Sequence, residues 1–311
     1  MAKGKFWLII LFAVVVYLIM GVYANFGNLL LALEKFNWIY LPLMIILVTL
    51  AYFVRFIKWN FFLRNVDVYL PLKQNLFVFF SGLSMTITPA KAGEIWKGWL
   101  IREINGENLS NTVPVVIVDR VTDVIGLIIL SLTGILYYKS GIYVLLILVI
   151  LFAAFIIAIK SETISNRLIS ILETRAGRYS GDIKDMHETF KRSLASKYLV
   201  GMSLLAVLAW FLECLSIFFV IQGFGQSISL VLSVFLYSFA SIVGAVSLIP
   251  GGLGVAEATL SGLLVIFGFS SSIAVGAALI IRLGTLWYGA ILGFLIYSIF
   301  KRNFIDSKKK I

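Results

Sequence analysis

The chain has 311 residues, of which 61% are apolar and 13% are charged, and its mean hydropathy is +1.02. These values exclude a water-soluble globular protein and indicate an integral membrane chain. The net charge of +11 does not indicate a nucleic-acid partner, because the basic residues gather beside the apolar segments, as expected at a lipid surface. With Cys214 and His187 as the only cysteine and histidine, we expect no internal disulfide, no metal site and no cofactor.

Six apolar segments are long enough to cross about 30 Å of hydrocarbon as helices of about 20 residues. They are residues 6–23, 38–62, 113–137, 142–159, 198–221 and 273–300. No charged or Pro/Ser-rich linker divides the chain, so we expect a single polytopic, all-α membrane domain over residues 1–311. The first segment lacks a convincing cleavage site and is predicted to be an uncleaved span.

Two further apolar segments, residues 76–101 and 230–269, are interrupted by proline and glycine. Thr88–Glu94 reads TPAKAGE, and Ser247–Glu257 reads SLIPGGLGVAE. Proline clashes with the preceding helical turn and glycine readily leaves helical φ/ψ, so each stretch should end one helix and start another. The arm before the first break is about 20 Å of helix, which is too short to cross and predicts a re-entrant hairpin. At the second break, two full spans are the alternative.

The two breaks have similar surroundings. In each, a glycine follows the proline by four positions, a glutamate follows soon after, and an arginine stands in the next apolar segment. These residues are Pro89, Gly93, Glu94 and Arg120 in one half and Pro250, Gly254, Glu257 and Arg282 in the other. Interrupted segments at matching places predict an internal repeat of the kind that forms transporter sites, here over about residues 76–137 and 230–300. Three full crossings separate the breaks, so the repeats are predicted to be inverted; chance similarity is the alternative.

Lysine and arginine positions predict the orientation. Basic residues gather at the N-terminus and in residues 64–73, 97–102, 160–197 and 301–310. The predicted external loops hold only Lys35 and Lys139, and Arg55 and Lys58 lie near the inner boundary. By the positive-inside rule, we expect a multi-pass protein of the cell (cytoplasmic) membrane with both termini cytoplasmic.

The loop 161–197 is the only sizeable polar segment. An amphipathic helix on the inner leaflet is predicted from apolar residues at helical spacing, with a solvated connector as the alternative. Those residues are Ile164, Leu168, Ile171 and Leu172.

Charged side chains inside spans are costly unless they are paired or hydrated, so each is a candidate functional residue. They are Lys91, Arg120 and Arg282 against Glu94, Asp119, Asp123, Glu213 and Glu257. We expect Arg120 and Arg282, with Lys91, to bind the phosphate or carboxylate of a lipid head group. The alternative is that the two arginines only neutralise carboxylates such as Asp123 and Glu257. Because acids outnumber bases in this set, the sum of charges does not by itself select an anionic substrate.

The helices that restart after Gly93 and Gly254 should present N–H groups and a positive dipole end to the interior, which suits an anion. Glu94 and Glu257 stand at the same ends and could instead cap their own helices. Proton coupling and recognition of a cationic head group are further alternatives. The predicted binding residues are Lys91, Gly93, Glu94, Arg120, Asp123, Pro250, Gly251, Gly252, Gly254, Glu257 and Arg282.

Three motifs resemble one family: residues 89–94 (PAKAGE), 119–123 (DRVTD) and 250–257 (PGGLGVAE). They are similar to the flippase-like membrane domain of lysylphosphatidylglycerol synthase/flippase and to related stand-alone bacterial and archaeal proteins, some labelled dolichyl-phosphate glucose synthases. Asp119 departs from the glutamate expected before that arginine. The resemblance implies translocation of a phospholipid, an aminoacylated phospholipid or a polyprenyl-phosphate carrier across the bilayer.

The expected function is therefore a lipid flippase whose partners are membrane lipids. The alternative is a membrane glycosyltransferase acting on a polyprenyl phosphate, but the longest polar loop is too short for a nucleotide-binding domain and no Asp-x-Asp lies outside the spans. A non-catalytic assembly subunit is a third reading, and the sequence leaves the oligomeric state open.

Overall fold

The computed structural model describes residues 3–88, 93–136, 180–194 and 196–306, with four single positions between 143 and 157. Within these residues every regular element is a helix and no strand occurs, which confirms the all-α prediction. Three helices are long and apolar enough to cross a membrane: Tyr40–Asn65, Tyr198–Gly223 and Ser271–Ile305. A fourth span would join Ile10–Tyr23 and Phe26–Glu34 across a 94° bend. Most of the predicted span 142–159 and the predicted amphipathic residues 164–172 lie outside the described residues.

Helices follow one another along both halves of the chain. The first half contains α1 (Lys3–Tyr23), α2 (Phe26–Glu34), α3 (Tyr40–Asn65), α4 (Leu72–Gly82), η1 (Leu83–Met85), α5 (Trp96–Asn105), α6 (Leu109–Ser131) and η3 (Leu132–Leu136). The second half contains α9 (Ser180–Ser193), α10 (Ser196–Gly223), α11 (Leu230–Val246), η5 (Pro250–Gly252), α12 (Val255–Ile266), α13 (Ser271–Arg282), η6 (Leu283–Trp287), α14 (Tyr288–Lys301) and η7 (Arg302–Asp306).

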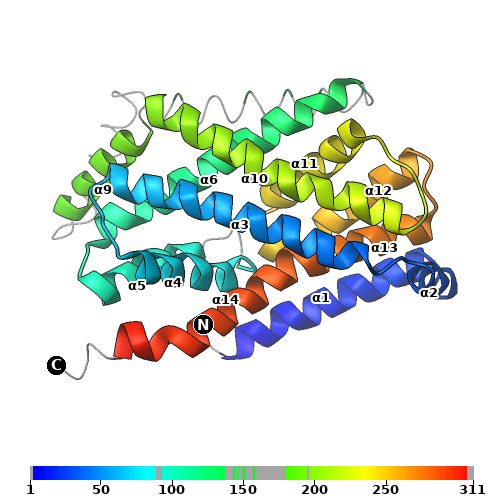
Figure 1. Ribbon diagram of the computed structural model, residues 1–311, viewed down its shortest axis with the longest axis horizontal. Coiled ribbons are helices and arrows are strands. Elements are labelled where there is room, and N and C mark those ends of the chain that lie inside the picture. The colour runs from blue at the N-terminus through cyan, green and yellow to red at the C-terminus, as the bar shows by residue number, and fades with distance from the viewer. Residues whose placement is uncertain are drawn as a thin grey trace.

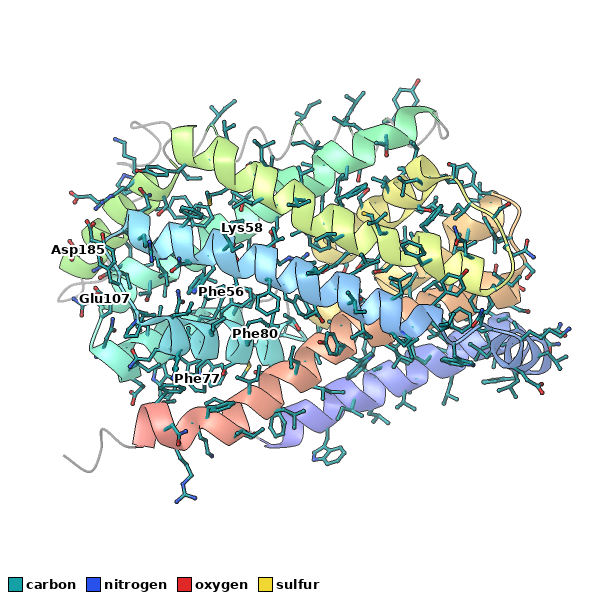
Figure 2. The ribbon with its side chains drawn as sticks, in the orientation of Figure 1. Phe56, Lys58, Phe77, Phe80, Glu107 and Asp185 are labelled. Atoms are coloured by element: carbon teal, nitrogen blue, oxygen red, sulfur yellow. The ribbon has the colours of Figure 1, made fainter. Side chains whose placement is uncertain are left out.

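The longest helices, α3 and α10, pack against each other along the long axis of the molecule, and both contact α6 (Figure 1). α3 buries a stripe that recurs every three or four residues and includes Met44, Val48, Tyr52 and Trp59. Lys58 lies on the same helix and is fully buried in the interior (Figure 2). A charged side chain at this depth requires partners of opposite charge.

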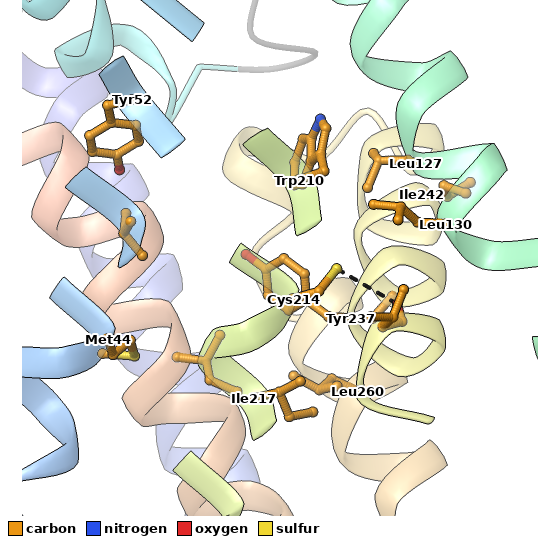
Figure 3. Close-up of a cluster of buried hydrophobic side chains, with 14 of the residues drawn as sticks. Met44, Tyr52, Leu127, Leu130, Trp210, Cys214, Ile217, Tyr237, Ile242 and Leu260 are labelled. Carbon is orange, nitrogen blue, oxygen red and sulfur yellow. Dashed lines mark hydrogen bonds between the residues drawn. The ribbon is translucent and has the colours of Figure 1, made fainter. Parts of the chain in front are cut away.

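α10 also packs on α11, and the layer between them is filled by large side chains. This cluster contains Trp210 of α10, Tyr237 of α11 and Leu127 of α6 (Figure 3). Cys214 is buried there, and its thiol donates to the Val234 carbonyl at 3.7 Å. One contiguous core therefore joins the two halves of the chain.

Two helical hairpins flank this core. α4 contacts α5, and α11 contacts α12. In Figure 1 the hairpins lie toward opposite ends of the long axis. The longest of their four arms, α11, has 17 residues. At 1.5 Å per residue this is about 26 Å, so no arm reaches the roughly 30 Å of the hydrocarbon layer.

The turns of the two hairpins meet inside the molecule. The first hairpin turn comprises residues 83–95, of which 89–92 are not described, and the second comprises residues 247–254. Ile87 of the first turn and Leu253 of the second belong to one small apolar cluster, with Ala13 of α1. A Cβ added at Gly251 would lie 3.7 Å from the Ile87 Cα. The two breaks found in the sequence are therefore neighbours in space.

The second hairpin turn has the backbone that its sequence predicts. α11 ends at Val246, and Gly251, Gly252 and Gly254 have φ values of 62°, 66° and 82°. Residues with a Cβ rarely adopt this region, so glycine is required for the sharp reversal. Gly252 also lies against α11, where an added Cβ would be 3.2 Å from the Gly244 Cα.

α14 crosses the end of the first hairpin at close range. A Cβ added at Gly293 would lie 2.7 Å from the Phe80 carbonyl oxygen and would clash with the Ser84 amide nitrogen. Both neighbours are backbone atoms and cannot rotate away. Gly293 is therefore the residue that lets α14 support the first hairpin turn.

We expect Gly293→Ala to destabilise the protein by about 1–3 kcal/mol, because overpacking forces the backbone apart. The measurement is the melting temperature of the purified protein in detergent. Gly262→Ala is the matched control, since Gly262 lies in α12 with no heavy atom within 4 Å of the added Cβ. Gly262→Ala should leave the melting temperature unchanged or raise it slightly. Equal melting temperatures for the two variants would contradict this packing.

Candidate functional site

A cavity of about 300 Å³ lies where the hairpin turns meet. Residues from α3, α4, α5, α6, α10, α11, α12 and α13 contribute to its wall, together with both hairpin turns. Its charged lining residues are Arg55, Glu94, Lys97, Arg120, Asp123, Glu213 and Arg282. Much of the remaining wall is apolar and includes Phe79, Leu83, Leu127, Ile249 and Leu286. The cavity therefore combines charge with an apolar surface.

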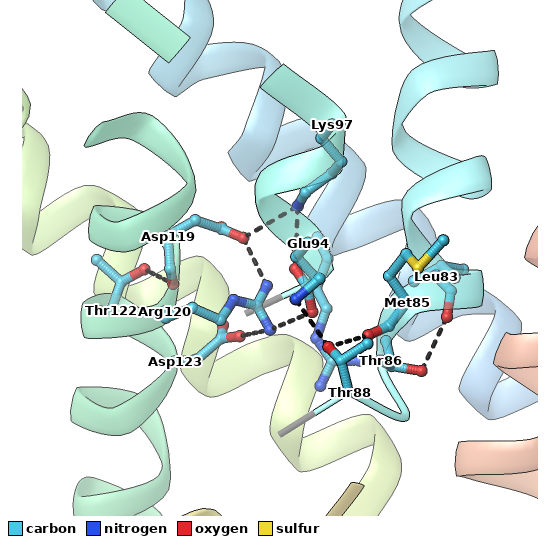
Figure 4. Close-up of polar contacts among 12 residues, drawn as sticks. Leu83, Met85, Thr86, Thr88, Glu94, Lys97, Asp119, Arg120, Thr122 and Asp123 are labelled. Carbon is cyan, nitrogen blue, oxygen red and sulfur yellow. Dashed lines mark hydrogen bonds and ion pairs between the residues drawn. The ribbon is translucent and has the colours of Figure 1, made fainter. Parts of the chain in front are cut away.

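Arg120 contacts three carboxylates on the side of the first hairpin (Figure 4). Its Nη2 lies 2.6 Å from Asp119 Oδ2. Its Nη1 lies 3.0 Å from Asp123 Oδ2 and 3.4 Å from Glu94 Oε1. Asp123 lies one turn along α6 from Arg120 and Asp119 directly precedes it, whereas Glu94 comes from the first hairpin turn. The arginine therefore ties that turn to α6.

Two buried lysines complete this first cluster. Lys97 Nζ lies 3.1 Å from Glu94 Oε2 and 4.4 Å from the Trp59 ring centroid. Lys58 Nζ lies 3.0 Å from Asp119 Oδ1, pairs with Asp123, and donates to the Thr122 hydroxyl at 3.1 Å. Three bases thus balance three acids, and this balance makes burial of the whole cluster tolerable.

The second hairpin turn has its own ion pair. Arg282, the last residue of α13, places Nε 2.7 Å from Glu257 Oε1, and its Nη2 donates to the Gly251 carbonyl oxygen. The other oxygen of Glu257 accepts the Gly254 N–H at 2.8 Å and caps α12. Tyr17 of α1 lies 3.5 Å from the same carboxylate and accepts the Trp287 indole N–H at 2.9 Å. The capping alternative is therefore confirmed for Glu257.

The two hairpins are held in the same way. In each half, an arginine from a helix that follows the hairpin reaches back to the glutamate beside the break: Arg120 to Glu94, and Arg282 to Glu257. The spacing that relates each proline to its arginine in the sequence thus corresponds to a physical contact in the fold. Neutralisation of carboxylates by the two arginines, the alternative considered from the sequence, is part of their role.

A further ion pair lines the cavity between α3 and α10. Arg55 of α3 pairs with Glu213 of α10, and the Arg55 guanidinium lies 4.5 Å from the Trp210 ring centroid. Tyr237 of α11 donates its hydroxyl to Glu213 Oε2 at 3.0 Å. Glu213 is a candidate functional residue from the sequence that is absent from the predicted binding residues, yet it lines the same cavity as Arg120.

Three basic residues of the site are missed by the sequence analysis. Arg55 and Lys58 are predicted near the inner boundary, and Lys97 in an inner polar segment, but all three are buried, at 7%, 0% and 2% exposure. With them, the described interior holds five acids and five bases rather than an excess of acids. The sequence does contain a signal for two of these buried bases, because Arg55 and Lys58 stand three positions apart in an otherwise apolar segment.

The predicted binding residues are largely brought together. Glu94, Arg120, Asp123, Gly251, Gly252 and Arg282 line the cavity. Glu257 contacts Arg282 through one carboxylate oxygen and the Gly254 N–H through the other, so these residues adjoin the cavity lining. Pro250 is the first residue of η5. The Gly93 N–H donates to the Thr88 hydroxyl at 2.7 Å within the first hairpin turn. Lys91 lies outside the described residues.

Comparisons with known proteins agree on one family. A model of the lysylphosphatidylglycerol synthase TM region matches residues 9–293. A UPF0104 membrane protein of Methanocaldococcus jannaschii is 25% identical over 72% of this chain and 97% of its own length. A UPF0104 membrane protein of Pyrococcus horikoshii is 24% identical over 93% of this chain and 95% of its own length. One from Methanothermobacter thermautotrophicus is 25% identical over 95% of this chain and 94% of its own length.

We expect Lys58→Met to destabilise the protein by about 3–5 kcal/mol, because Asp119 and Asp123 would lose a fully buried cation that they share. The readout is the melting temperature and the yield of monodisperse protein in detergent. The double variant Lys58→Met/Asp123→Asn removes charge from both sides and should recover part of the loss.

The control for this variant is Arg192→Met. Arg192 forms an exposed ion pair with Asp67 at 2.8 Å, and such surface pairs contribute about 1 kcal/mol or less. An equal drop in melting temperature for Lys58→Met and Arg192→Met would show that the first cluster does not depend on its internal charge balance.

Proposed function

This chain belongs to the family of the lysylphosphatidylglycerol synthase TM region and is a membrane protein, and we propose that it moves a lipid with an anionic head group across the bilayer. The head group binds in the cavity between the hairpin turns while the acyl or prenyl tails stay in the surrounding lipid. Phospholipids, aminoacylated phospholipids and polyprenyl phosphates share the phosphate that this site would recognise. The phosphate is therefore the common requirement of the proposal.

One observation carries the proposal: the two arginines beside the hairpin turns are more accessible than the carboxylates with which they pair. The side chains of Arg120 and Arg282 are 26% and 15% exposed, whereas those of Asp119, Asp123 and Glu257 are 0–5% exposed. The ion pairs are neutral in sum, but an entering molecule meets guanidinium groups first. Arginine binds phosphate through paired N–H donors, so this accessible surface favours an anion.

The size and lining of the cavity support an amphiphilic substrate. About 300 Å³ is at the lower end of the ~300–1,000 Å³ typical of small-molecule sites. The volume suits one head group and is too small for a long glycan. Apolar wall residues such as Phe79, Leu127 and Ile249 would lie against the glycerol or the first methylenes of the tails.

In the proposed carrier, the ion pairs link binding of the substrate to movement of the hairpin turns. A bound phosphate competes with Glu94 for Arg120 and with Glu257 for Arg282, so binding loosens the contacts that hold each hairpin turn. With six crossings, cytoplasmic termini and hairpins entering from opposite leaflets, alternate loosening of the two turns would open the site to either side. This topology is part of the proposal, and its basis is the placement of lysine and arginine and the position of the hairpins at opposite ends of the molecule.

The test is reconstitution. In proteoliposomes containing a tail-labelled fluorescent phosphatidylglycerol, the protein should make inner-leaflet label accessible to an external quencher without any nucleotide-sugar. The double variant Arg282→Gln/Glu257→Gln removes the guanidinium without leaving a buried carboxylate unpaired. Its rate should fall about 10- to 100-fold, the loss expected for one or two charge-assisted hydrogen bonds to the substrate.

Arg192→Gln is the matched control and should keep the wild-type rate, because its ion pair with Asp67 lies at the surface. Unchanged lipid movement in the folded double variant would refute the site. Transfer of a sugar from a nucleotide-sugar to a polyprenyl phosphate by the purified protein would favour the glycosyltransferase alternative. The lipid that copurifies with the protein, identified by mass spectrometry, should carry a phosphate.

A further inference from the structure

The wall of the cavity formed by α3, α10 and α11 is chemically different from the wall that carries Arg120 and Arg282. It presents Arg55, Trp210, Glu213, Tyr237 and Ser241. Its one acid and one base pair with each other, so this wall has no net charge. It nevertheless offers several hydrogen-bonding groups beside two aromatic rings, whose centroids are 6.4 Å apart.

This wall is poorly suited to a cationic group. Both oxygens of Glu213 are already engaged, Oε1 by Arg55 and Oε2 by the Tyr237 hydroxyl. The other carboxylates that line the cavity, Glu94 and Asp123, each contact two bases. The negative charge of each of these carboxylates is therefore already balanced by at least one base, and an ammonium group would also meet the positive charge of Arg55 on this wall.

The same wall suits hydroxyl groups, which both donate and accept. A carboxylate has about four lone-pair positions and a guanidinium has five N–H donors, so Glu213 and Arg55 retain hydrogen-bonding capacity beyond their mutual contact. The Tyr237 hydroxyl can accept while it donates to Glu213. Ser241 lines the cavity, and its hydroxyl has no partner among the described residues.

The aromatic side chains add an apolar surface that suits the C–H groups of a polyol. Trp210 and Tyr237 belong to the buried cluster between α10 and α11 (Figure 3). Aromatic rings pack well against the C–H groups of a polyol, while hydroxyl groups bond to the polar tips beside them. A wall of paired charge, hydroxyls and rings therefore recognises a neutral, hydroxyl-rich group.

We propose that this wall is a second subsite, which binds the uncharged polyol part of the head group, such as glycerol, inositol or a hexose, while Arg120 and Arg282 hold its phosphate. This inference rests on the proposed function, because it assigns a substrate class to the same cavity. It selects phosphodiesters with a hydroxyl-rich head group over phosphate monoesters and over amine-bearing head groups. Tyr237 is then a specificity-determining residue.

The test is binding of lipids that share identical tails and differ only in the head group. Phosphatidic acid, phosphatidylglycerol, phosphatidylinositol, phosphatidylethanolamine and lysyl-phosphatidylglycerol are titrated into the full-length protein in detergent, with binding followed by native mass spectrometry. Phosphatidylglycerol and phosphatidylinositol should bind about tenfold more tightly than phosphatidic acid, and both amine-bearing lipids more weakly than phosphatidylglycerol.

Tyr237→Phe keeps the ring and removes the hydroxyl, so it should reduce the preference for the polyol lipids about 2- to 10-fold and leave phosphatidic acid binding unchanged. Tyr288→Phe is the matched control, since its hydroxyl lies 2.8 Å from the Thr49 hydroxyl and it does not line the cavity. Tyr288→Phe should keep the wild-type preference.

The outcomes test the polyol subsite independently of the proposed lipid transport. If phosphatidic acid binds as tightly as the polyol lipids, if Tyr237→Phe keeps the preference, or if lysyl-phosphatidylglycerol binds more tightly than phosphatidylglycerol, the polyol subsite is wrong. The phosphate site still stands in those cases, provided that Arg282→Gln/Glu257→Gln weakens binding of every lipid. If that double variant binds all the lipids as the wild type does, the proposed function itself fails.

Discussion

The pairing of arginine with glutamate in an apolar interior is the interaction on which the rest of this structure depends. Each hairpin turn interrupts a helical segment inside the molecule, and each turn is joined by one glutamate to an arginine of a later helix, Glu94 to Arg120 and Glu257 to Arg282. Neither member could stay charged alone at this depth without a large loss of solvation energy. The two ion pairs therefore hold the hairpin turns in position, and the cavity lies between these two turns.

Charge balance does not make the cavity chemically neutral. The carboxylates lie behind the bases, so the accessible surface is basic at Arg120 and Arg282. On the wall that carries Arg55 and Glu213, the two charges neutralise each other. A bound molecule could therefore interact with this wall only through hydrogen bonds and apolar contacts. In the proposed carrier, the same kind of ion pair would thus form two surfaces of different selectivity, depending on how exposed its basic partner is.

The sequence predicts the parts of this arrangement that depend on local chemistry. The second break follows from Pro250, which cannot continue the preceding helix, and from the glycines at 251, 252 and 254, which can adopt positive φ. Arg120 and Arg282 stand out as charges within apolar segments. Lys97 is missed because it follows the first break in a polar stretch, and only the packing of α5 against α4 and α6 buries it. The ion pairs of Lys58 are not predicted, because its partners on α6 lie more than sixty positions away, beyond the reach of helical spacing.

Glu257 joins three helices at a single carboxylate. It caps α12, pairs with the end of α13 through Arg282, and approaches Tyr17 on α1. A phosphate that drew Arg282 away from this carboxylate would therefore change the contacts of all three helices at once. Through this one carboxylate, α1, the most peripheral of the three helices, is connected to the cavity at the centre of the molecule.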